Sequence, residues 1–251
     1  MEDWAATFAA TPPCDAFRLQ LSLMMTGPRS QVDGDDDVLM LLGVSWAHLV
    51  SPLQRAVFVT IDGKVYKLLK AMYGLRDAGA AFDRKVLDVM NLMGVSLGKF
   101  SICVGYRKAH VICRDECLSE VNTACLVQMV RLVRWGDDFS LSGRRSLCST
   151  FRNEMGKHLL VKTTAVLGPN VEMGDVQEAI HLNRLVRLYP PGAEGGERWE
   201  IEADPRHVEI LVSQMGLNNE SKAVSTPGVR MTDEDDGKEL DAENRACCSS
   251  R

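Results

Sequence analysis

Long apolar runs are missing from this sequence, and so are several other features that mark special classes of protein. No stretch reaches the roughly 20 apolar residues that a membrane-spanning helix needs. The amino-terminal stretch also lacks the basic and apolar regions of a signal peptide. Aromatic residues make up only 6% of the chain, while hydrophobic residues reach 45%, which is ordinary for a globular protein. We therefore expect an intracellular protein, cytoplasmic or nuclear, with no membrane contact.

The eight cysteines lack the regular spacing of a disulfide framework or a zinc site. A zinc site could be built from His110, Cys113, Cys117 and Cys125, but these residues contain no paired Cys-x-x-Cys knuckle. Buried free thiols are the alternative that we favour.

Charge is unevenly distributed, although the net charge is only −5. Residues 55–108 contain ten Lys and Arg against four Asp, a net charge of +6, and residues 131–165 contain seven against three acids, or +4. The first 54 residues and the last 58 are acidic, at −5 and −7. A basic centre of this kind fits a surface that faces phosphate groups.

Apolar spacing predicts the main elements of the chain. Helical spacing predicts helices after Asp15, from about 77 to 93, and over 145–158. The continuous apolar run 38–45 predicts a buried strand, and the acidic stretch 33–37 before it reads as a solvated linker. Several further short strands are expected at 57–61, 65–69, 100–106, 108–113, 159–164 and 180–188.

Gly136, Asp137 and Asp138 interrupt an apolar run and are followed by apolar and polar residues in alternation. This pattern predicts two strands joined by a tight turn, since Gly adopts the positive φ that such turns require. The turn would hold two adjacent carboxylates, which are ligands that Mg²⁺ prefers. An ordinary polar turn has the same pattern, so the neighbouring motifs must decide.

Four motifs follow one another along the chain. Lys-Leu-Leu-Lys-Ala-Met-Tyr-Gly-Leu-Arg-Asp-Ala stands at 67–78, Gly-Asp-Asp-Phe at 136–139, Glu-Ile-Glu-Ala-Asp-Pro at 200–205 and Ser-Thr-Pro-Gly-Val at 225–229. Together they resemble the reverse transcriptases of Ty1/copia retrotransposons. That family has Leu-x-Lys-x-x-Tyr-Gly-Leu-Lys-Gln-Ala in the first motif and Tyr-Val-Asp-Asp or a close variant in the second.

The resemblance implies an RNA-directed DNA polymerase, a nucleotidyltransferase whose substrates are a primer–template and a deoxynucleoside triphosphate. Two Mg²⁺ ions would assist attack of the primer 3′-hydroxyl on the α-phosphate. Asp137 and Asp138 are then the catalytic and metal-binding residues. His48, Tyr73, Gly74 and Arg76 match family positions near the nucleotide or template.

Gly43 is the main departure from the family pattern. The family's first catalytic carboxylate lies in Asp-Val-x-x-Ala-Phe, and residues 43–48 here read Gly-Val-Ser-Trp-Ala-His. Gly43 therefore occupies the position of a catalytic Asp, and His48 that of an aromatic residue. Glycine has no metal ligand, so we expect impaired catalysis.

Short strands and helices that alternate without regular crossovers predict an α+β fold. The resemblance makes it a polymerase palm-like antiparallel sheet with packed helices and a partial fingers region. We expect a fingers-like or linker segment at 1–37, the palm-like core at 38–190, a connection at 191–230 and an acidic, disordered tail at 231–251. The integrase and RNase H regions of the polyprotein would be missing partners.

Two other functions fit the same residues. One is a non-catalytic palm-like module that binds nucleic acid or protein. The other is an unrelated metal-dependent phosphohydrolase that uses the Gly-Asp-Asp turn.

Overall fold

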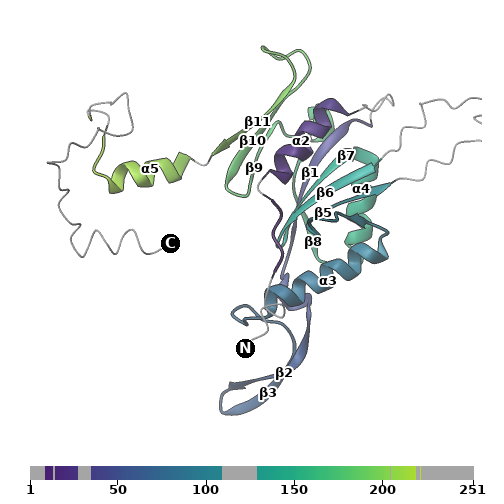
Figure 1. Ribbon diagram of the computed structural model, residues 1–251, viewed down its shortest axis with the longest axis vertical. Coiled ribbons are helices and arrows are strands. Elements are labelled where there is room, and N and C mark those ends of the chain that lie inside the picture. The colour runs from purple at the N-terminus through teal and green to yellow at the C-terminus, as the bar shows by residue number, and fades with distance from the viewer. Residues whose placement is uncertain are drawn as a thin grey trace, which may run out of the picture. The chain divides into compact units, whose positions relative to one another are not determined.

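A six-stranded antiparallel sheet organises the first part of the chain in the computed structural model (Figure 1). The structure describes residues 9–13, 15–27, 35–108, 129–203, 205–218 and 221. The sheet has the order β4-β5-β6-β7-β1-β8, so β1 lies between two strands that follow it much later in the chain. Its strands are β1 (Asp37–Val44), β4 (Ser96–Leu97), β5 (Val104–Lys108), β6 (Met129–Trp135), β7 (Asp138–Arg144) and β8 (Val161–Leu167).

Two helices, α3 (Ala78–Leu92) and α4 (Arg145–Met155), cover one face of this sheet. Alternate residues of β1 and β7 point to that face, among them Met40, Leu42 and Phe139. They pack against helix residues that recur at helical spacing: Phe82, Val86, Val89, Met90, Cys148, Phe151 and Met155. This apolar cluster is the main core, and it follows the apolar spacing of the sequence.

Helix α2 (Ala16–Thr26) and a three-stranded sheet cover the other face. The small sheet has the order β11-β10-β9, from β9 (Glu178–His181), β10 (Arg184–Tyr189) and β11 (Arg198–Ala203). Its Val186 joins Phe17 and Leu21 of α2 against β1 and β8 in a second, smaller core. Two layers therefore cover the central sheet.

A separate two-stranded hairpin, β2 (Pro52–Ile61) and β3 (Lys64–Lys70), extends from the region below α3 in Figure 1. The short 3-10 helix η1 (His48–Val50) links it to β1, and a second 3-10 helix, η2 (Val171–Met173), follows β8. Most side chains of the hairpin are exposed. Its turn at Asp62 and Gly63 has positive φ at both residues, which suits the twist of a hairpin.

The expected helices and the strand at 38–45 are confirmed within one to three residues, and so is the α+β class with antiparallel sheets. The single strand expected at 180–188 is wrong. It is a hairpin that turns at Leu182 and Asn183, both with positive φ. Strand β11 was not expected, and the strand expected at 100–106 begins only at Val104. The strand expected at 108–113 lies outside the described residues after Lys108.

Contacts divide the chain into two units, residues 1–204 and 205–251. The described part of the second unit contains α5 (Pro205–Gln214), and Gly216 follows it with a positive φ. The expected boundaries at 37, 190 and 230 stay predictions. The tail 231–251 and the possible zinc ligands at 110–125 lie outside the described residues. Among the described helices, none is long and apolar enough to cross a membrane.

Candidate functional site

Gly136 and Asp137 form the tip of the β6–β7 hairpin, as the sequence predicts. Trp135 pairs with Asp138 across the hairpin, so only two residues remain in the turn. Gly136 has a φ of 60°, a conformation that glycine adopts without steric cost. Asp137 is exposed, while Asp138 begins β7 and is half-buried.

Gly43 lies beside this tip on the neighbouring strand. It pairs directly with Asp138 in the antiparallel β1–β7 register. The next residue, Val44, donates its backbone N–H to the carbonyl oxygen of Asp137 at 2.9 Å. A Cβ atom at Gly43 would lie 3.7 Å from Asp138 Oδ1. Position 43 therefore lies beside the carboxylate of Asp138 and next to the backbone of Asp137.

The place of β8 as the third strand of the site was not anticipated from the sequence. Lys162 lies opposite Gly43, and Thr164 Oγ1 would lie 4.0 Å from a Cβ atom at that glycine. The β1–β8 register shifts between Leu41 and Leu42, which leaves Thr164 as an extra, bulged residue. The alternation at 159–164 predicts a strand, but its partner is set by contacts more than 100 residues apart.

Burial raises the pKa of Asp138, and repulsion from the carboxylate of Asp137 raises it further. A cation bound at the carboxylates would favour the ionised form of Asp138 and so lower its pKa. Yet the described residues contain no group of three or more His, Cys, Asp and Glu side chains arranged to hold a metal ion. Asp137 and Asp138 alone do not supply the carboxylates from two strands that a pair of Mg²⁺ ions needs, so the residues present do not fit the expected two-ion site.

The acidic residues before β1 do not replace the missing carboxylate. Asp37 begins β1 and pairs with Arg144, whereas Gly43 is close to the other end of the strand. Six residues of strand separate the two positions by roughly 20 Å. Asp35 instead accepts hydrogen bonds at 2.8 Å from the backbone N–H and the hydroxyl of Ser146, at the start of α4. Both hydrogen bonds are exposed and Asp35 is half-buried, so the interpretation of 33–37 as a solvated linker stays a prediction.

His48 and Tyr73, which the resemblance places near the nucleotide, lie in contact. Their ring centroids are 4.6 Å apart, and Nδ1 of His48 is buried without a hydrogen-bond partner among the described atoms. Tyr73 is 56% exposed. Gly74 follows with a φ of 91°, and Arg76 is exposed two residues later. The loop therefore presents an aromatic ring and a cation to solvent.

Asp77, which stands where the family has glutamine, is paired with the β2–β3 hairpin. Arg55 Nε and Nη2 donate to its two carboxylate oxygens at 2.8 and 3.0 Å. These hydrogen bonds lower the pKa of Asp77. The pair connects the start of α3 to the hairpin.

Helix α2 covers the sheet face that carries Asp138 almost up to the carboxylate. Gln20 Nε2 donates to the carbonyl oxygens of Arg131 and Ser140, one on each strand of the β6–β7 hairpin. The hydroxyl of Ser140 donates back to Gln20 Oε1 at 2.6 Å. Ser140 is only two residues from Asp138, so the open part of this face is confined to the strand ends around the tip.

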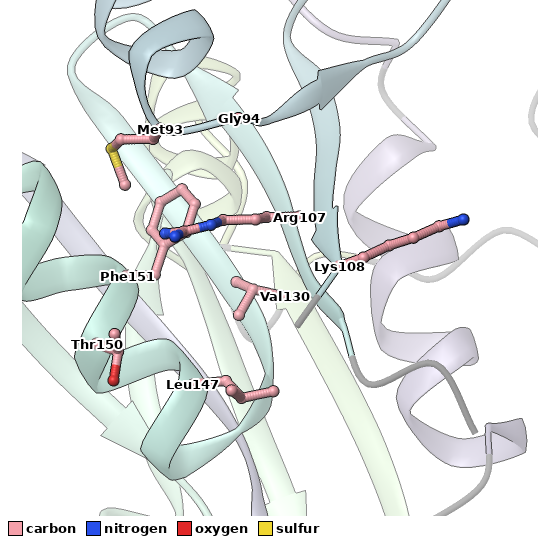
Figure 2. A pocket seen from close by; sticks show the side chains of 8 residues that line it. All are labelled: Met93, Gly94, Arg107, Lys108, Val130, Leu147, Thr150 and Phe151. Carbon is pink, nitrogen blue, oxygen red and sulfur yellow. The ribbon is translucent and has the colours of Figure 1, made fainter. Parts of the chain in front are cut away.

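A pocket of about 400 Å³ lies on the other face of the sheet and is separate from the carboxylates. Figure 2 shows its lining residues: Met93, Gly94, Arg107, Lys108, Val130, Leu147, Thr150 and Phe151. Phe151 and Val130 belong to the main core, toward which Phe139 points, so Asp138 points the other way. Arg107 is already paired with Glu154 of α4. The pocket contains no metal ligand set and is not a candidate for the site.

Comparisons with protein-family models, with curated proteins and with solved structures found no match for this chain.

Proposed function

We propose that this chain is a palm-like nucleic-acid-binding domain of the Ty1/copia reverse transcriptase kind, with an incomplete catalytic site. The observation that carries the proposal is the pairing of Gly43 with Asp138. A position that the motif Asp-Val-x-x-Ala-Phe assigns to a carboxylate lies in register beside the second of two tip carboxylates. The motif and the strand register both relate position 43 to the carboxylates of the β6–β7 turn, which supports the proposal.

Basic residues on β8 and on the β2–β3 hairpin support nucleic acid as the ligand. Lys162 lies opposite Gly43 on β8, and the β2–β3 hairpin carries Lys64, Lys67 and Lys70, all exposed. Phosphate groups attract such cations, and the counterions released on binding provide much of the affinity. The exposed ring of Tyr73 adds a surface on which a base can stack.

The missing carboxylate makes a non-catalytic role the second candidate. Because Gly43 contributes neither charge nor ligand, Mg²⁺ would have to bind through Asp137 and Asp138 alone. We therefore propose that binding of a primer–template or of related nucleic acids persists while nucleotide transfer is slow or absent. In an intact element, integrase and RNase H regions of the polyprotein would accompany this domain.

Primer extension tests the proposal. The native chain and Gly43→Asp are given one RNA template with a DNA primer, deoxynucleoside triphosphates and Mg²⁺. We expect no detectable extension by the native chain and partial recovery by the variant. Vigorous extension by the native chain would show that position 43 is not the catalytic position. Phosphate release from simple phosphate esters without a primer would instead favour a phosphohydrolase.

A further inference from the structure

The turn after β1 presents a tryptophan that no part of the fold requires. Trp46 is 64% exposed and has a φ of 55°. A bulky residue seldom adopts this left-handed conformation, which Gly or Asn adopts readily. In the described part of the chain its indole has no ring or hydrogen-bond partner. An exposed ring on a strained backbone contributes little to folding, so the outlier points to a function.

Hydrogen bonds bring basic segments to both sides of this turn. Ser45 N–H donates to the carbonyl oxygen of Leu160 at 2.8 Å, and Lys157 and Lys162 lie on either side of Leu160 in the sequence. At the far end of η1, Ala71 N–H donates to the Ser51 carbonyl oxygen at 2.8 Å, directly after Lys70. These three lysines are exposed. Exposed lysines therefore stand close in sequence to the two residues, Leu160 and Ala71, whose backbones bond to either end of this turn segment.

We propose that Trp46 is a stacking site for an unpaired base of single-stranded nucleic acid. The ring would stack on the base, and the flanking lysines would contact the phosphates on either side. Every base has a face that can stack, whereas bases within a duplex are already paired and stacked. The site thus selects single strands over duplexes without reading their sequence. This inference rests on the proposed nucleic-acid-binding function and adds the form of the ligand.

The carboxylates at the hairpin tip limit where the strand can run. Val44 N–H bonds to the Asp137 carbonyl oxygen, only two residues before Trp46. Phosphates would be repelled by Asp137 and Asp138 and attracted to Lys70 and Lys157. Lys162, opposite Gly43, faces the same side of the sheet as Asp138 and would hold the phosphate nearest the tip.

The test is binding of a labelled oligo(dT) of about twelve nucleotides, a length within the range of known single-strand sites, to the full chain at low salt. Fluorescence anisotropy compares the native chain with Trp46→Ala, Trp46→Phe and Trp46→Gly. Phe100→Ala removes another aromatic ring, fully exposed, from the connection between β4 and β5 and is the control. A duplex of the same length measures selectivity.

We expect Trp46→Ala and Trp46→Gly to bind roughly tenfold or more weakly, as loss of one stacked base predicts. Trp46→Phe should retain most of the affinity, and Phe100→Ala should bind as the native chain does. Trp46→Gly relieves the strained conformation, so its melting temperature should not fall, which separates loss of binding from loss of folding. The duplex should bind more weakly than the single strand.

Equal binding by Trp46→Gly and the native chain would overturn the stacking site and leave the proposed function standing. An equal loss in Phe100→Ala, or a duplex bound as well as the single strand, would also overturn it. If the native chain bound neither nucleic acid at low salt, the proposed function would be contradicted together with this inference.

Discussion

Gly43 of β1 and Asp138 of β7 lie directly opposite each other, and a Cβ atom at position 43 would approach Asp138 Oδ1 to 3.7 Å. Both positions therefore face the same side of the sheet. The distances of 3.7 and 4.0 Å to the nearest atoms are ordinary van der Waals contacts, so a Cβ atom can be added at position 43 without displacing its neighbours. This allows the missing carboxylate to be restored by a single substitution.

Neutralising Asp138 should stabilise the folded chain at neutral pH. Burial and the charge of Asp137 raise the pKa of Asp138, so the folded state binds this proton more tightly than the unfolded state. Stability from this group is present at low pH and is lost as pH rises through the raised pKa. We expect Asp138→Asn to raise the melting temperature at pH 7 by about 1–3 °C, and by less at pH 4. The measurement is calorimetry across this pH range.

Asp137→Asn, at an exposed position, is the control and should give a smaller gain. A lower melting temperature for Asp138→Asn at pH 7 would contradict this electrostatic account.

His181 should make stability fall in acid. It is buried between Phe17 and Trp135, and burial lowers its pKa to about 4. The unfolded state therefore binds more protons between pH 6.5 and 4, and stability is lost as pH falls through this window. The loss attributable to His181 would reach about 3 kcal/mol in full.

Urea denaturation at pH 7, 5.5 and 4.5 measures this loss. His181→Phe should show a shallower decline than the native chain, and His158→Phe, at an exposed position, should decline as the native chain does. The same decline in the native chain and His181→Phe would refute the assignment.

Removing only one partner of the Arg134–Asp83 ion pair should strongly destabilise the folded chain. Arg134 is 2% exposed and donates to Asp83, whose other oxygen accepts the Ala10 N–H at 2.6 Å. Arg134→Met leaves a buried, unpaired carboxylate and should cost about 3–5 kcal/mol. Urea denaturation should show that Arg134→Met/Asp83→Leu recovers much of this loss.

The control for the ion pair is Arg187→Met on β10, which breaks two exposed ion pairs, with Glu178 and Glu202, and should cost only about 1 kcal/mol. A cost for Arg134→Met no larger than that of the control would show that the buried pair is not needed for stability.

Nucleic-acid binding should weaken with salt, with part of the dependence coming from the β2–β3 hairpin. For single strands, each neutralised phosphate contact contributes roughly 0.7 to the slope of log K against log salt. Lys67→Gln/Lys70→Gln should therefore lower that slope by roughly 1.4. The control Arg18→Gln/Arg184→Gln removes the same charge from outside the basic segments and should leave it unchanged. Equal effects of the two double variants would indicate that only net charge matters.

The sequence predicts where helices and strands lie along the chain better than it predicts which elements pack or pair together. Helices α3 and α4 have apolar residues at helical spacing, and β1 is continuously apolar because it is buried on both faces. The β9–β10 turn was missed because Leu182 and Asn183 adopt positive φ without a glycine to mark them. Trp199 and Ile201 alternate with glutamates, which is a strand pattern. Strand β11 was nevertheless missed because residues 200–205 were interpreted only as one of the four motifs.

The site was predictable only in part, because some of its residues are brought together by contacts between segments far apart in the sequence. Local sequence placed Asp137 and Asp138 at a hairpin tip, and the motif placed Gly43 on a neighbouring strand. The approach of Lys162 and Thr164 depends on a bulge in β8, and the cover by Gln20 of α2 depends on a contact across 120 residues. Neither has a local signal. Trp46 could have been noticed as a large residue in a turn, but its positive φ is visible only in the structure.

Extension of one RNA-templated DNA primer by four forms of the chain tests most directly whether Gly43 replaces a catalytic carboxylate. The forms are the native chain, Gly43→Asp, Gly43→Asn and Gly43→Asp/Asp138→Asn, each assayed with and without Mg²⁺. Asn matches Asp in size and lacks its charge, so it separates charge from shape. Loss of one positioned electrostatic contributor costs about 10²–10³ in rate. We therefore predict Mg²⁺-dependent synthesis by Gly43→Asp alone, at least about 100-fold above the other three. Equal synthesis by the native chain and Gly43→Asp, or no synthesis by Gly43→Asp while it still folds and binds the primer–template, would contradict the account.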